Sequence, residues 1–275
     1  MGEIVKLLKY YVTLLIPKFL IMGVIRKFSI GSYEFRLKMG VVDRPHYGYC
    51  VLNAAKLAKE LKHDRICVVE FGVAGGNGLL NLEYHAQEVE KLLGIKIDVY
   101  GFDTGEGLPT LLDYRDLPYH WKPGFFKMDV PKLQSRLKKA KLIIGNISET
   151  SKTFFRDHNP APIAAMFQDF DFYSSTEKAL KMLDEDDKYF LPRVYCYLDD
   201  IIGSEVELYN DYTGERLAIN EFNASHPFKK FSPAYHLITR ANTQTWHHQI
   251  FIYHNFQHPK YNDFVSIENQ QLPNG

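Results

Sequence analysis

Residues 66–78 read Ile-Cys-Val-Val-Glu-Phe-Gly-Val-Ala-Gly-Gly-Asn-Gly, and this stretch decides the fold. Its first five residues, Ile66 to Glu70, are apolar except for the last, which predicts a short buried strand. Four glycines follow, and a helical pattern opens directly after them; they are Gly72, Gly75, Gly76 and Gly78. A strand, a glycine turn and a helix together form a nucleotide-binding unit, because glycines let the backbone approach a ligand at the helix N-terminus.

Strands and helices alternate along the rest of the chain. Strand character recurs at 96–102, 142–145, 162–167, 191–198, 232–239 and 249–254. Helical patterns occupy 49–62, 78–93, 131–139, 148–156, 175–183 and 213–224, whereas 31–48 reads as a loop. This order predicts an α/β fold of the Rossmann-like, doubly wound type, with a mostly parallel seven-stranded sheet, an antiparallel late strand and helices on both faces.

Length and composition limit the number of domains and the class of partner. A chain of 275 residues with 45% hydrophobic residues suits one α/β domain with additions. We predict a helical N-terminal extension over 1–45 and one domain over 46–275. Basic and acidic residues both number 33, so nothing indicates a nucleic-acid partner, which would require a basic excess. The three cysteines, Cys50, Cys67 and Cys196, form no Cys-x-x-Cys motif, which indicates core thiols of a cytoplasmic protein.

The first 30 residues differ in character from the rest. Apolar residues recur at helical spacing between lysines, and Pro17 divides them into two halves. Neither half reaches the ~20 residues that a membrane span requires, and no small-residue cleavage site follows. Two interpretations remain open: a helix that lies on an anionic membrane surface, or a helix packed on the domain or on a second subunit of a homo-oligomer.

The glycine spacing indicates which kind of nucleotide the turn would bind. The dinucleotide pattern Gly-x-Gly-x-x-Gly does not fit, because Ala74 stands two residues after Gly72. Glu70 stands two residues before that glycine, where a carboxylate could face an ammonium or sulfonium cation but would repel a pyrophosphate. Asp103 ends the second strand, where an acidic group accepts hydrogen bonds from ribose hydroxyls.

The motif acidic-x-Gly-x-(Gly/Ala)-x-Gly, filled here by Glu70, Gly72, Ala74 and Gly76, resembles the first motif of the class I S-adenosylmethionine-dependent methyltransferases. The resemblance implies S-adenosylmethionine as the cofactor, with its adenine beside Asn146 and Ile147 after the third strand. The implied cofactor-binding residues are Glu70, Gly72, Gly75, Gly76, Asn77, Gly78, Asp103, Asn146 and Ile147.

Carboxylates follow the fourth and fifth strands. Asp169 and Asp171 come after the fourth strand, and Asp199 and Asp200 end the fifth. If these strands are neighbours, Asp169, Asp199 and Asp200 meet at one edge of the sheet and repel each other unless a cation lies between them. Mg²⁺ or another hard divalent cation suits such oxygen ligands. The alternative is that the aspartates only cap the next helix or bind loop amides.

The pattern Asp-x-Asp-x-Tyr-x-Ser-Thr at 169–176, the later Asp-Asp pair and Gly-Leu-Pro at 107–109 resemble the macrocin O-methyltransferase family, metal-dependent enzymes that methylate sugar hydroxyls. The resemblance covers 68–200. It implies metal ligation by Asp169, Asp199 and Asp200, with Asp169 also at the catalytic centre, and Asp171 as general base. The implied acceptor is a hydroxyl of a small molecule or glycan, most specifically of a sugar in a glycan or glycosylated metabolite.

Other interpretations stay open from the sequence alone. The aromatic insertion at 110–129 departs from the family and forms either part of an acceptor pocket or lid, or ordinary packing. A nicotinamide-dependent oxidoreductase and a non-catalytic nucleotide-binding module are the alternative functions. His247, His248, His254 and His258 lack the dense ligand spacing of a zinc site.

Overall fold

The computed structural model describes residues 18–266, so the helical pattern predicted over the first 16 residues lies outside the described part. Two helices precede the main body, α2 (Lys18–Phe28) and α3 (Tyr33–Lys38). Within 18–266, no helix is both long enough and apolar enough to cross a membrane.

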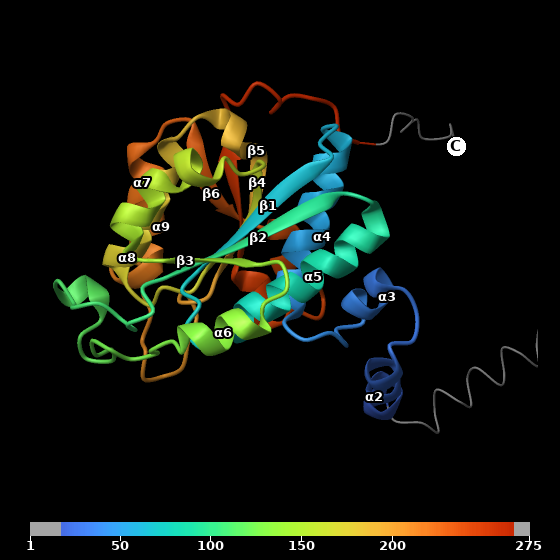
Figure 1. The fold of residues 1–275 in the computed structure, drawn as a ribbon, viewed down its shortest axis with the longest axis horizontal. Coiled ribbons are helices and arrows are strands. Elements are labelled where there is room, and N and C mark those ends of the chain that lie inside the picture. The colour runs from blue at the N-terminus through green and yellow to red at the C-terminus, as the bar shows by residue number, and fades with distance from the viewer. Residues whose placement is uncertain (1–17, 267–275) are drawn as a thin grey trace, which may run out of the picture.

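A seven-stranded sheet forms the centre of the described chain, in the order β3-β2-β1-β4-β5-β7-β6 (Figure 1). Its strands are β1 (Arg65–Phe71), β2 (Lys96–Asp103), β3 (Lys141–Ile144), β4 (Ile163–Gln168), β5 (Phe190–Leu198), β6 (Lys229–Pro233) and β7 (Ile250–Asn255). The first five strands pair in parallel, whereas β7 is antiparallel to both β5 and β6. The predicted fold class is therefore confirmed.

Helices cover both faces of the sheet. They are α4 (Pro45–Glu60), α5 (Asn77–Leu93), α6 (Val130–Arg136), α7 (Ile147–His158), α8 (Tyr173–Leu180), α9 (Gly214–Ser225) and α10 (Tyr235–Ile238). Single 3₁₀ turns are η1 (Tyr114–Asp116), η2 (Lys181–Asp184), η3 (Asp187–Tyr189) and η4 (Thr245–His248). Figure 1 shows α4 and α5 on one side of the sheet and α7, α8 and α9 on the other.

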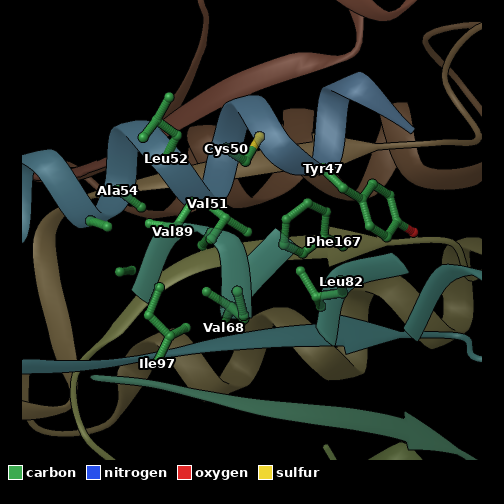
Figure 2. Close-up of a cluster of buried hydrophobic side chains, with 14 of the residues drawn as sticks. Tyr47, Cys50, Val51, Leu52, Ala54, Val68, Leu82, Val89, Ile97 and Phe167 are labelled. Carbon is green, nitrogen blue, oxygen red and sulfur yellow. The ribbon is translucent and has the colours of Figure 1, made fainter. Parts of the chain in front are cut away.

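Apolar side chains fill the space between each helical layer and the sheet. Figure 2 shows Val51 of α4 and Val89 of α5 packed over Val68 of β1, and these three side chains are fully buried. The second cluster, on the other face, contains Cys67 and Cys196, while Cys50 belongs to the first. All three thiols are buried and unbridged, as predicted, so they act as small apolar core side chains.

The strand order reverses direction between β1 and β4, and the segments that follow these two strands lie side by side. The Asp169 amide donates to the Phe71 carbonyl at 3.0 Å, and the Gly72 amide donates to the Phe102 carbonyl at 2.9 Å. In open α/β sheets, ligands bind at the carboxyl ends of the strands where the order reverses. The glycine turn and the aspartates after β4 therefore share this edge.

Two local predictions were wrong. The interval 31–48 contains α3, whose first turn is capped because the Phe35 amide donates to Ser32 Oγ, and α4 begins at Pro45. The predicted strand 232–239 is instead the end of β6 followed by α10. The Ala234 amide still donates to the Ile250 carbonyl of β7 at 2.9 Å, and the chain then turns into α10, from which Leu237 reaches the core.

Gly72 gives a direct test of this close approach, because its φ is +79° and an added Cβ would lie 1.8 Å from the Asp169 carbonyl oxygen. Gly72→Ala should lower the free energy of unfolding by at least about 2 kcal/mol, from the backbone strain and the clash together. Urea denaturation measures the effect. Gly75→Ala is the matched control, since a Cβ there meets nothing within 4 Å. Equal stability of the two variants would contradict the close approach.

Candidate functional site

A cavity of about 330 Å³ lies at the carboxyl ends of the strands. One part of its wall follows β1, β2 and β3 and includes Gly72, Asp103, Asn146 and Ile147. The opposite part follows β4 and β5 and includes Asp169, Asp171, Asp199 and Asp200. The structure therefore brings both groups of predicted site residues to one cavity.

Asp103 is fixed to the glycine turn by backbone amides. Its Oδ2 accepts hydrogen bonds from the Val73 amide at 2.8 Å and the Ala74 amide at 2.9 Å, and its Oδ1 accepts one from the Gly105 amide at 2.6 Å. These bonds hold the carboxylate at the cavity wall. Asn146 is fixed similarly, since its side-chain oxygen accepts from the Ser148 amide at 2.9 Å and begins α7.

Glu70 does not form part of the cavity wall, contrary to the expectation that it faces a bound cation. Its Oε1 accepts a hydrogen bond from the Tyr47 hydroxyl at 2.7 Å, and an added Cβ on Gly78 would lie 1.9 Å from the same oxygen. The carboxyl group is thus buried beneath the first turn of α5. Its Oε2 has no hydrogen-bond partner within residues 18–266, and burial raises its pKa to about 8.

The remaining predicted cofactor residues shape the turn from outside the cavity wall, and they are Gly75, Gly76, Asn77 and Gly78. Gly76 has a φ of +83°, and an added Cβ would lie 2.2 Å from Leu133 of α6. Glycine at this position therefore allows α5 to begin close against α6.

Three carboxylates form a group suited to holding a metal ion. One oxygen from each of Asp169, Asp199 and Asp200 lies within 4.8 Å of the others. Asp200 is buried, while Asp169 and Asp199 are half-buried. Among residues 18–266 no histidine belongs to such a group, so the described structure contains no zinc-type cluster at the late histidines.

Tyrosine hydroxyls fix two of these carboxylates and a buried glutamate binds the backbone beside them, and sequence reasoning did not identify these residues. The Tyr209 hydroxyl donates to Asp200 Oδ1 at 2.8 Å, and the Tyr197 hydroxyl donates to Asp199 Oδ1. The Asp200 amide donates to Glu215 Oε2 at 3.1 Å. Glu215 lies in the first turn of α9, more than ten residues after β5, and no spacing in the sequence links it to the aspartates.

Asp171 has an unusual backbone conformation that places it beside this group. Its φ is +60°, in the left-handed region, and its amide donates to Asp200 Oδ2 at 2.7 Å. The bond ties the segment after β4 to the end of β5. Strained backbone of this kind is common at functional sites.

Burial and the crowding of negative charge disfavour ionisation of Asp169, Asp171 and Asp200. Burial and the charges of Asp200 and Asp199 raise the pKa of Asp171 to about 9. Burial and Asp199 raise the pKa of Asp200 to about 7, and burial together with Asp200 raises the pKa of Asp169 well above its usual value. A cation among the carboxylates would favour their ionised forms and lower these pKa values.

The capping alternative does not account for the aspartates after β4. The N-cap of α8 makes no side-chain cap bond, and the Ser174 amide donates to Asp116 Oδ1 at 2.8 Å instead. Asp116 belongs to the aromatic insertion, so it anchors the insertion to α8. The other alternative was that the aspartate carboxylates bind backbone amides of loops. Within the described residues this holds only for Asp200, whose Oδ2 accepts a hydrogen bond from the Asp171 amide.

The aromatic insertion contributes to the cavity. Trp121 and Phe126 line it, and Trp121 also packs with Leu117 and Phe172. The Tyr119 hydroxyl donates to the Glu207 carbonyl at 2.5 Å, which joins the insertion to the loop after β5. Both predicted roles, pocket wall and packing, thus occur in the same segment.

The N-terminal end of α4 packs against residues that adjoin the cavity. His46 stacks on Tyr197 with ring centroids 4.3 Å apart, and Tyr47 binds Glu70. Burial lowers the pKa of Arg44, but the charges of Tyr47, Glu70, Asp169 and Asp199 outweigh burial, so that its pKa is raised. Arg44 therefore supplies positive charge near the acidic residues.

Comparison with known proteins shows the fold. No family model matches the chain, and no curated protein matches it. The chain is similar to the crystal structure of CalS11, a calicheamicin methyltransferase, with a TM-score of 0.51 and 18% identity over 86% of this chain and 90% of that one. Other similar structures are the O-methyltransferase NovP (TM-score 0.47, 13% identity, 77% and 80% covered) and apo CalS11, described as a TDP-rhamnose 3'-O-methyltransferase (0.46, 15%, 86% and 92%). The likeness to CalS11 shows that this chain has a methyltransferase fold.

Buried Glu70 predicts a specific pH dependence of stability. Because its pKa is raised to about 8 in the folded state, from 4.5, the folded form holds a proton that the unfolded form releases first. The contribution of Glu70 to stability should therefore fall as pH rises from 5 to 8, by about 1.4 kcal/mol per pH unit at most. Glu70→Gln should remove this part of the slope in urea denaturation curves.

The matched control is Glu60→Gln, which changes an exposed carboxyl in the last turn of α4. It should leave the slope as in the wild type. Parallel pH profiles for the wild type and Glu70→Gln would show that Glu70 is ionised when the protein is folded.

Proposed function

We propose that this protein is an S-adenosylmethionine-dependent, divalent-metal-assisted O-methyltransferase that acts on a hydroxyl of a small molecule or glycan, specifically of a sugar in a glycan or glycosylated metabolite. The observation that carries the proposal is that two sets of residues share one cavity. One wall bears Asp103, Asn146 and Ile147, and the other bears the aspartates after β4 and β5. The methyltransferase fold supports it.

The residues of the first wall fit the cofactor. Asp103 would accept hydrogen bonds from the ribose hydroxyls, and Asn146 and Ile147 would adjoin the adenine. Gly72 would keep the backbone close to the ligand, while Glu70, Gly75, Gly76, Asn77 and Gly78 shape the turn behind it. A cavity with carboxylates on both walls suits a cationic cofactor better than the pyrophosphate of a nicotinamide dinucleotide.

The residues of the second wall fit a hard cation such as Mg²⁺. Asp169, Asp199 and Asp200 would hold it, since they offer only oxygen ligands, and the raised pKa values of Asp169 and Asp200 support a positive charge between them. Tyr197 and Tyr209 each bind one carboxylate oxygen and so limit how the ligands rotate. When bound, the cofactor supplies an electrophilic methyl group, and the metal supplies positive charge that stabilises an ionised hydroxyl.

Asp171 would take the proton from the acceptor hydroxyl. It lines the cavity, and its amide is bonded to Asp200, so its carboxyl group is held beside the proposed metal ligands. Trp121 and Phe126 would cover the acceptor and exclude water. The indole Nε1–H of Trp121 is buried without a partner among residues 18–266, which leaves a donor for an acceptor oxygen. The unbridged core thiols suit a cytoplasmic site of action.

Labelled S-adenosylmethionine, Mg²⁺ and a glycan-containing extract test the activity directly, with the labelled product identified afterwards. Asp199→Ala and Asp200→Ala should each reduce methyl transfer by at least about 100-fold and weaken Mg²⁺ binding in calorimetry, while S-adenosylmethionine binding persists. Excess EDTA should abolish turnover by the wild type.

Asp263→Ala serves as the control, because it removes an exposed carboxylate outside the cavity and should retain full activity. Unchanged turnover in EDTA would exclude the metal role. Stabilisation against heating by NAD, and none by S-adenosylmethionine, would instead support the oxidoreductase.

Asp171→Asn separates proton transfer from metal binding. The amide side chain keeps the size of the carboxyl group but is a very weak base, so methyl transfer should slow by about 10²–10⁴-fold. Mg²⁺ affinity should remain within a few-fold of the wild type. A wild-type rate in the variant would remove Asp171 as the base.

A further inference from the structure

Helix α2 is attached to the body through a small part of its surface. Ile25 is its one buried side chain among residues 20–28, and Arg26 forms an ion pair with Asp43. Figure 1 shows α2 projecting beside α3, away from the sheet and from the helices that cover it. The helix therefore has faces that the described chain does not cover.

One of these faces is apolar. Leu20, Val24 and Phe28 follow one another at four-residue spacing, which places them on one side of the helix. Their exposed fractions are 50%, 49% and 65%. We call these three residues the α2 stripe. Exposed apolar side chains aligned in this way typically mark an interaction site.

Charge next to the stripe is positive. Helix α2 has no acidic residue, and its last turn carries Arg26 and Lys27. The first 30 residues contain five basic residues and one acidic residue, although the whole chain is neutral. The rest of the chain therefore has a negative excess, so the N-terminal part of the sequence that includes α2 is the more basic.

We propose that the α2 stripe docks on a bilayer surface that carries anionic lipid headgroups. Apolar side chains would enter the interfacial layer while Lys27 faces the headgroups, the arrangement typical of interfacial helices. This inference is independent of the proposed activity. A second copy of the chain is a poorer occupant, because a symmetric contact across the stripe would bring like charges of Lys27 together.

Vesicle sedimentation with the full chain tests the proposal. The protein should bind vesicles of phosphatidylcholine with about one quarter phosphatidylglycerol more tightly than pure phosphatidylcholine, and less tightly as salt rises. The triple variant Leu20→Ser, Val24→Ser, Phe28→Ser should bind at least about tenfold more weakly, because the apolar contacts are lost. Lys27→Glu should weaken binding to the anionic vesicles alone.

Phe264→Ser is the matched control, because Phe264 is 67% exposed and lies near the C-terminal end of the described chain. It should bind like the wild type. Phe28→Trp keeps the stripe apolar and adds a probe, whose emission should shift to shorter wavelength on anionic vesicles. Because Phe28→Trp removes no apolar side chain, its emission tests the proposal even if the triple serine variant fails to fold.

Three results would overturn the proposal: no binding of the wild type to anionic vesicles, equal binding by the wild type and the triple variant, or equal affinity for neutral and anionic bilayers. Sedimentation equilibrium distinguishes the remaining occupants of the stripe. If the protein is a dimer that Phe28→Ser dissociates, and if it binds no vesicles, the α2 stripe is the contact with a second copy. A monomer whose residues 1–17 cover the stripe would bind no vesicles.

Discussion

Mutual repulsion among clustered carboxylates is the constraint on which the functional edge of this protein depends. Asp169, Asp171, Asp199 and Asp200 come from two neighbouring parallel strands, and Asp200 also adjoins Glu215. Burial and the neighbouring negative charges raise the pKa values of Asp169, Asp171, Asp200 and Glu215, so the fold disfavours the ionised forms of these four carboxyl groups. The fold keeps them together through hydrogen bonds from Tyr197, Tyr209 and the Asp171 amide. An arrangement of this kind suits a cationic ligand and a cation.

The same edge is held in place by backbone contacts of the glycine turn. Gly72 allows the segment after β1 to touch the Asp169 carbonyl, and the amides of Val73 and Ala74 bind Asp103. The turn thus helps to position Asp103 on one side of the cavity and Asp169 on the other. Glu70, which the motif pointed to most directly, acts behind this turn through Tyr47.

Sequence reasoning identified most of the sheet because hydrophobic runs and strand length are local properties. It failed where tertiary contacts decide the conformation. The end of β6 at Pro233 depends on pairing with β7, and α3 depends on its Ser32 cap and on packing against α4 and α5. The Ser32 cap is a local signal that the sequence reading missed, whereas the pairing of β6 and the packing of α3 leave no pattern in residues 31–48 or 232–239 alone.

The sequence by itself determined the alternation of strands and helices, the glycine turn and the two pairs of aspartates that follow β4 and β5, because spacing along the chain encodes these features. Only the tertiary structure decided that Glu70 lies under α5, that Asp116 rather than Asp169 or Asp171 caps α8, and that Tyr197, Tyr209 and Glu215 surround the aspartates. The physical reason is that strand spacing fixes where a residue leaves the sheet, whereas the direction of its side chain and its partners depend on segments that are distant in the sequence and meet only when the helices pack.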